Sequence, residues 1–224
     1  KTFDFLALIP AKTALPNEIL ISEEAGITML YVVLNGNNTL DKLNEASGET
    51  IWSVPTGVAP YGIAKANNKI YVTNWAGSVP DKGDRDVAGV PWGSAKVDPI
   101  TGATREGTVS VFDPNSGQLL KEILVGLHPN DIIFAPNEKF IYVANANSDA
   151  ISAINTNEDA VSETISVRLG NEHNPYWGDS PNGLAILEDG KTLFVANGMD
   201  NALAVVELGN LSNSSSTEKQ SNSS

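Results

Sequence analysis

The chain has 224 residues, 41% hydrophobic and 18% charged, a composition typical of a soluble globular domain rather than of a disordered polypeptide. Its formal net charge of −13 repels phosphate backbones, so we expect no nucleic-acid partner. The absence of cysteine excludes disulfides, thiolate zinc sites and cysteine nucleophiles. No run approaches the roughly 20 apolar residues that a membrane-spanning helix needs, so we expect no membrane span.

An internal repeat runs through the sequence. Four times a proline is followed 11 to 15 residues later by an aromatic residue, which opens a short hydrophobic run that ends in asparagine. The prolines and aromatic residues pair as Pro16 with Tyr31, Pro60 with Tyr71, Pro129 with Tyr142, and Pro181 with Phe194. Recurrence in every unit predicts that the terminal asparagines cap the backbone rather than bind a ligand; they are Asn35, Asn74, Asn145 and Asn197.

Each repeat unit has the pattern of a small antiparallel sheet. Short β-branched runs are separated by turn residues every 8 to 12 positions, and in the clearest unit strands are expected at 131–135, 140–145, 150–155 and 161–167. Four-stranded units of about 40 to 45 residues in tandem are typical of a β-propeller. The predicted fold is therefore an all-β propeller with about four blades, in units near 16–54, 60–125, 129–167 and 181–208.

The two ends of the chain fit this plan differently. The fourth unit lacks a last strand, whereas residues 1–9 contain a spare one at Phe3–Ile9, which belongs either to a neighbouring blade or to a closed four-bladed ring. Residues 1–210 are thus assigned to the propeller. Residues 211–224 are almost all polar and are expected to form a flexible tail or loop.

The repeats resemble the YVTN repeats of YncE-like seven-bladed propellers. The resemblance rests on 71–74 (YVTN) and its copies, on 125–130 (VGLHPN) and on 180–185 (SPNGLA), and it covers nearly all of residues 16–208. It is closer still to propellers fused to an alkaline-phosphatase-type phosphoesterase domain, through 31–40 and 74–77. The resemblance implies a sector of a larger exported bacterial protein, periplasmic or secreted. No residue here matches the phosphoesterase part, so its metal chemistry is not carried over.

Two long inserts are expected on one face of the propeller. Residues 75–107 lie between the second and third strands of their unit, and residues 169–180 lie between the last strand of one unit and the first of the next. Because antiparallel strands reverse direction, both loops should open on the same side. Elaborated loops on a rigid scaffold usually carry binding, so this face is the default site.

The candidate binding residues combine aromatic rings with polar groups, which suits a small polar ligand such as a glycan, or a companion domain. They are Trp75, Arg85, Trp92, His128, Asn130, Asp131, His173, Tyr176 and Trp177. Two alternatives remain open. The aromatic rings could fix the long loops to the propeller rim as a small core of their own. Each histidine could be a hydrogen-bonded packing residue rather than a base or ligand.

Cofactor and catalytic signals are weak. Asp81, Asp84 and Asp86 could hold calcium, but their spacing misses the EF-hand pattern and Lys82 and Arg85 could neutralise them, so no cofactor is expected. The expected function is a non-catalytic binding or scaffold module. The alternative is a lactonase-like propeller hydrolase, or part of a phosphoesterase whose catalytic domain lies elsewhere. The inner strands are apolar and only Asp131 offers a carboxylate there, which disfavours catalysis along the channel.

Overall fold

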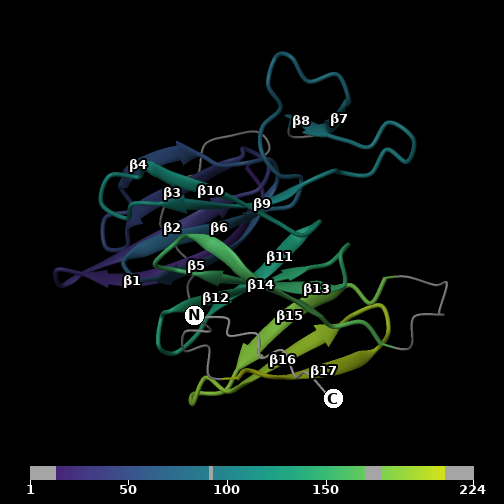
Figure 1. Ribbon diagram of the computed structural model, residues 1–224. Coiled ribbons are helices and arrows are strands. Elements are labelled where there is room, and N and C mark those ends of the chain that lie inside the picture. The colour runs from purple at the N-terminus through teal and green to yellow at the C-terminus, as the bar shows by residue number, and fades with distance from the viewer. Residues whose placement is uncertain (1–13, 91–92, 170–177, 210–224) are drawn as a thin grey trace, which may run out of the picture.

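The computed structural model describes residues 14–90, 93–169 and 178–209, and every regular element in these ranges is a β-strand (Figure 1). The strands are β1 (Pro16–Glu24), β2 (Ile27–Leu34), β3 (Thr39–Asn44), β4 (Thr50–Pro55), β5 (Pro60–Ala66), β6 (Lys69–Asn74), β7 (Val87–Val90), β8 (Gly93–Lys96), β9 (Gly107–Phe112), β10 (Leu119–Val125), β11 (Pro129–Phe134), β12 (Phe140–Asn145), β13 (Ala150–Asn155), β14 (Ala160–Ser166), β15 (Pro181–Ile186), β16 (Thr192–Asn197) and β17 (Ala202–Glu207). None of the described segments is a helix of the length and hydropathy that crossing a membrane requires.

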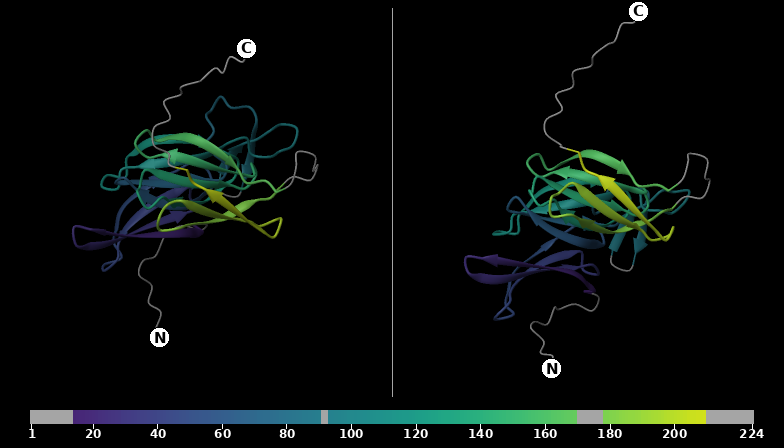
Figure 2. Two further views of the ribbon diagram at one scale, coloured as in Figure 1. Left: turned by 60° about the horizontal axis from the view of Figure 1, so that its bottom comes forward. Right: turned by 90° about the horizontal axis from the view of Figure 1, so that it is seen from below.

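Apart from the β7-β8 hairpin, the described strands form four antiparallel sheets that follow one another along the chain. The first is β1-β2-β3-β4, the second β5-β6-β9-β10, the third β11-β12-β13-β14, and the fourth has three described strands, β15-β16-β17. Their first strands lie at one edge and contact in the order β1, β5, β11, β15, so the sheets stand side by side like blades (Figures 1 and 2). The predicted all-β propeller of four-stranded blades is confirmed.

The hydrophobic core lies between successive sheets rather than within one. On β2, Tyr31 is fully buried and faces the second sheet, where it clusters with Ile63 and Val72. Tyr71 repeats this contact against the third sheet, and Tyr142 repeats it against the fourth. Each sheet therefore has one face that carries the aromatic residue and one that receives it, which follows from the period-two alternation of strand side chains.

A repeated backbone link ties the loops at one end of every sheet. The residue before each repeat proline has a positive φ, although a residue before proline normally prefers the extended region. The four angles are 45° at Leu15, 56° at Ala59, 52° at His128 and 51° at Ser180. This bend aims each carbonyl at the loop that leaves the second strand, where it accepts a hydrogen bond of 3.0 to 3.1 Å from the N–H of Asn35, Trp75, Ala146 and Gly198, respectively.

The register of the asparagine repeat is shifted by one residue in the first unit. Pro60, Pro129 and Pro181 stand opposite Asn74, Asn145 and Asn197, but Pro16 stands opposite Leu34. The first unit has one more residue between its aromatic ring and its asparagine, which moves Asn35 just beyond the strand. Asn35 instead donates a hydrogen bond from Nδ2 to the carbonyl of Pro60 in the next sheet, at 2.8 Å.

Candidate functional site

The two inserts meet on one face, as the strand directions predict. A groove of about 670 Å³ is lined by Ala103 from the first insert, by the loop between β14 and β15, and by loops of the third and fourth sheets. Its lining residues are Ala103, Leu127, Ala146, Asn147, Ser148, Asp149, Arg168, Gly178, Ser180 and Met199. We call this groove, together with the surrounding loops, the loop face.

The groove combines an apolar surface with a charged edge. Leu127, Ala146 and Met199 supply the apolar part, and Met199 is 72% exposed. At the edge, Nε of Arg168 lies 4.0 Å from Oδ2 of Asp149. The other oxygen of Asp149 accepts a hydrogen bond from the N–H of Ser180 at 3.2 Å, so the carboxylate joins two loops of the groove.

Two further carboxylates, those of Asp179 and Asp200, lie beside this edge. Asp179 is buried and accepts a hydrogen bond from the N–H of Leu169 at 2.5 Å. A side-chain hydrogen bond with Asp179, together with the charges of Asp179 and Asp149, raises the pKa of Asp200. Asp149 and Asp179 thus link the loops around the groove.

The first insert is folded rather than a plain loop. Its strands β7 and β8 form a hairpin that projects from the sheets (Figure 1). At its base, Nζ of Lys96 lies 2.9 Å from Oε1 of Glu106 and donates to Oγ of Ser78 at 2.9 Å. Burial disfavours ionisation of Glu106, but the hydrogen bonds from Ser78 and Lys96 outweigh it and lower its pKa. The hairpin is therefore held at a fixed place on the loop face.

Trp75 and His128, two of the candidate binding residues, lie side by side, and Tyr61 joins them. The Trp75 ring stacks on Tyr61, with centroids 4.8 Å apart, and on His128, with centroids 5.2 Å apart. Trp75 also packs on a small buried cluster that includes Ala95 of β8. Burial lowers the pKa of His128, so the stacked imidazole favours its neutral form. These contacts support the packing interpretation of both residues.

The three aspartates of the weak calcium candidate, Asp81, Asp84 and Asp86, make separate contacts. Oδ2 of Asp84 accepts a hydrogen bond from the N–H of Asp81 at 2.9 Å and lies 3.9 Å from Nζ of Lys96. Oδ2 of Asp86 lies 3.3 Å from Arg105. The cations beside these acids are thus Lys96 and Arg105, rather than the expected Lys82 and Arg85, and Arg85 itself is exposed on the insert.

Asn130 and Asp131 lie inside the propeller and bond to its backbone. Nδ2 of Asn130 donates to the carbonyl of Pro181 at 3.3 Å, and Oδ2 of Asp131 accepts from the N–H of Leu184 in the next sheet at 2.6 Å. Sequence reasoning missed a matching carboxylate, Glu18, which accepts from the N–H of Ile63 at 2.9 Å. The signal was available, because 16–19 (PNEI) matches 129–132 (PNDI).

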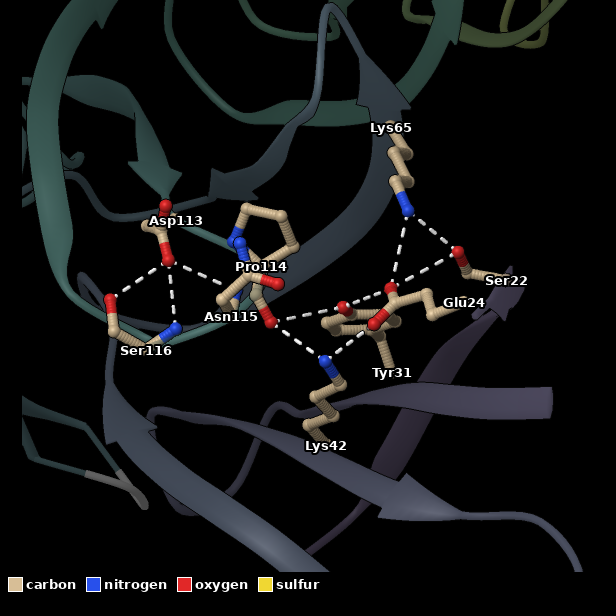
Figure 3. Close-up of polar contacts among 9 residues, drawn as sticks. All are labelled: Ser22, Glu24, Tyr31, Lys42, Lys65, Asp113, Pro114, Asn115 and Ser116. Carbon is tan, nitrogen blue, oxygen red and sulfur yellow. Dashed lines mark hydrogen bonds and ion pairs between the residues drawn. The ribbon is translucent and has the colours of Figure 1, made fainter. Parts of the chain in front are cut away.

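A partly buried polar cluster lies at the opposite end of the sheets, between the first and the second (Figure 3). Glu24, at the end of β1, lies 2.6 Å from Nζ of Lys42 and 3.2 Å from Nζ of Lys65. Tyr31 donates to the same carboxylate at 2.6 Å, and Lys42 donates to the carbonyl of Pro114, in the turn between β9 and β10, at 2.8 Å. Burial opposes ionisation of Glu24, but these hydrogen bonds prevail and lower its pKa to about 2.

Four predicted residues, Trp92, His173, Tyr176 and Trp177, lie outside the described residues, as does the Phe3–Ile9 segment. Within the described ranges, no three histidine, aspartate or glutamate side chains are placed to share a metal ion. Of the carboxylates discussed above, Asp131, Asp149 and Asp179 accept hydrogen bonds from backbone N–H groups, whereas Glu24 and Glu106 bond to both lysine and hydroxyl groups.

Comparisons with known proteins agree on the fold. No protein-family model and no curated protein matches the sequence. The structure is similar to the hydrazine synthase of Kuenenia stuttgartiensis, with a TM-score of 0.58 and 22% identity over 84% of this chain and 43% of that chain. It is also similar to the dihydro-heme d1 dehydrogenase NirN, with a TM-score of 0.54 and 14% identity over 88% of this chain and 36% of the other. The chain thus spans less than half of either neighbour. Both neighbours are β-propeller proteins, and at these identities the similarity establishes a β-propeller fold for this chain and no more.

Proposed function

We propose that this chain is a non-catalytic β-propeller binding module of an exported bacterial protein, periplasmic or secreted, and that its loop face binds a small polar ligand or a companion domain. The observation that carries the proposal is the groove where the 75–107 insert meets the loops of the third and fourth sheets. Its volume of about 670 Å³ falls in the range of small-molecule sites.

The chemistry of the groove favours a ligand with both apolar and hydroxyl-bearing surfaces, such as an oligosaccharide. The exposed side chain of Met199 and the side chains of Leu127 and Ala146 can cover an apolar face. Arg168 and Asp149 at the edge, with the amide of Asn147, can exchange hydrogen bonds with hydroxyl groups. Trp75 contributes to this face by fixing the insert through its packing on the cluster that includes Ala95, rather than by stacking on the ligand.

The test is binding of a panel of neutral oligosaccharides, measured by calorimetry and ligand-observed NMR. Met199→Trp places a large ring in the groove at an exposed position and should abolish binding. Leu120→Trp, on the outer strand β10 at 47% exposure, adds the same ring away from the groove and should leave binding unchanged. Equal binding by both variants would refute the groove as the site. Hydrolysis of lactones or phosphate esters that is lost on chelation and retained by Met199→Trp would favour the hydrolase alternative.

A further inference from the structure

The chain contains two methionines and no cysteine, and the fold gives the two thioethers different surroundings. Met29, on β2, is partly buried and packs on the cluster of Tyr31 and Ile63 between the first two sheets. Met199, in the turn between β16 and β17, is 72% exposed. A peroxide that approaches from solvent therefore reaches the side chain of Met199 more readily than that of Met29.

The backbone holds Met199 at the groove of the loop face. Its N–H donates to the carbonyl of Asp179 at 3.2 Å, and the N–H of Gly198 donates to the carbonyl of Ser180 at 3.1 Å, so two hydrogen bonds tie this turn to the loop between β14 and β15. Ala146, from the corresponding turn of the third sheet, lines the same groove. The exposed thioether is therefore fixed beside the apolar surface of the groove.

We propose that Met199 is an oxidation site of this chain and that its conversion to the sulfoxide weakens ligand binding at the loop face. The oxidant is hydrogen peroxide. A lone pair of the sulfur attacks one peroxide oxygen, the S–O bond forms as the O–O bond breaks, and the leaving hydroxide takes up the proton of the transferred oxygen and departs as water. The sulfur loses two electrons and the peroxide gains two.

Oxidation changes what the groove offers to a ligand. The thioether is a flexible apolar group, whereas the sulfoxide carries a polar oxygen that is hydrated in the free protein. A ligand that covers Met199 with an apolar face removes this water without supplying a donor, and burial of an unpaired polar group is unfavourable. We expect the affinity to fall roughly tenfold. This effect rests on the binding role proposed above, whereas the oxidation itself does not.

The oxidation site is tested on the full chain with isotope-labelled methionine methyl groups. The two methyl signals in the NMR spectrum are assigned with Met199→Leu and Met29→Leu, which keep the size and hydrophobicity of the side chain. Under hydrogen peroxide the Met199 signal should disappear at least about five times faster than the Met29 signal. Equal rates, or faster loss of the Met29 signal, would overturn the assignment of the site.

The effect on binding is tested by calorimetry with an oligosaccharide that binds the untreated wild type. After peroxide treatment the wild type and Met29→Leu should both bind about tenfold more weakly, whereas treatment should leave the affinity of Met199→Leu at its own starting value. Unchanged affinity of the oxidised wild type, or an equal loss in Met199→Leu, would overturn the effect. If the untreated wild type binds no oligosaccharide, the proposed function fails and the effect on binding fails with it, while the two oxidation rates still decide the oxidation site.

Discussion

Substitution of Glu24 by glutamine should destabilise the propeller through the contact between its first two sheets. The change removes the negative charge but keeps the size of the side chain, so Lys42 and Lys65 lose their shared anion. Lowering the pKa of Glu24 from 4.5 to about 2 corresponds to about 3 kcal/mol of preference for the ionised folded state. The carboxylate keeps 18% of its surface exposed, and solvent screening reduces the expected loss to about 1 to 2 kcal/mol.

The pH dependence of this effect gives a sharper measurement than the loss at one pH. A carboxylate whose pKa is lowered in the folded state stabilises it above its unfolded pKa, and this contribution disappears as the pH falls through the folded value. The difference in unfolding free energy between the wild type and Glu24→Gln, from urea titrations, should therefore be constant above about pH 5 and vanish toward pH 2. Glu45→Gln, at an exposed position in the same sheet, is the matched control. A difference that matches the control, or that persists unchanged at pH 2, would refute the reasoning.

Three further outcomes are expected. Burial raises the pKa of Glu18, so its charge opposes folding at neutral pH. Glu18→Gln should therefore raise the urea midpoint at pH 7, and this gain should disappear at acidic pH. A variant midpoint below that of the wild type at pH 7 would contradict the assignment. Gly126→Ala would place a methyl group 2.7 Å from the Asn145 side chain and should cost about 1 to 3 kcal/mol, whereas Gly83→Ala, with open space, should be nearly neutral in the same thermal melts. In an NMR titration the pKa of the His128 imidazole should lie below its ordinary value of 6.5, and wild-type stability should therefore decline as the pH falls through that lowered pKa. A measured pKa at or above 6.5, for the imidazole signal assigned with His128→Gln, would exclude the stacked, buried position.

The fold could be predicted because the repeat exposes its own periodicity. Within the described ranges, the β-branched runs between turn residues of the four units form strands, and the alternating direction of antiparallel strands places the two inserts on one face. The register of Asn35 could not be read in the same way. The first unit has one additional hydrophobic residue before its asparagine. This residue does not change the strand that the pattern predicts, but it moves Asn35 out of the strand pairing.

The side-chain contacts of the candidate site and of the Glu24 cluster were harder to predict, because they join residues far apart in sequence. Lys42 lies on an inward-facing position of β3, where a charge is unexpected, and its partner carbonyl at Pro114 is 72 residues away. The alternation of side chains along the strand predicts that this lysine points inward, but it does not identify the groups that compensate its buried charge. The same limit applies to Trp75. Its residue type suggested ligand stacking, whereas its ring packs on Tyr61 of β5 and on His128 of the loop between β10 and β11.

The position of the long insert explains how this scaffold can gain a binding face without losing stability. In the third and fourth sheets, the turn between the second and third strands is short, and Asn145 pairs with Ala150 as Asn197 pairs with Ala202. In the second sheet the insert replaces that turn, yet Asn74 pairs with Thr108 in the same register. The interfaces between sheets, where the aromatic rings are buried, are therefore unchanged by the insertion. Sequence variation at this turn can alter the groove while the core that positions it stays constant, which is what the proposed binding role of the loop face requires.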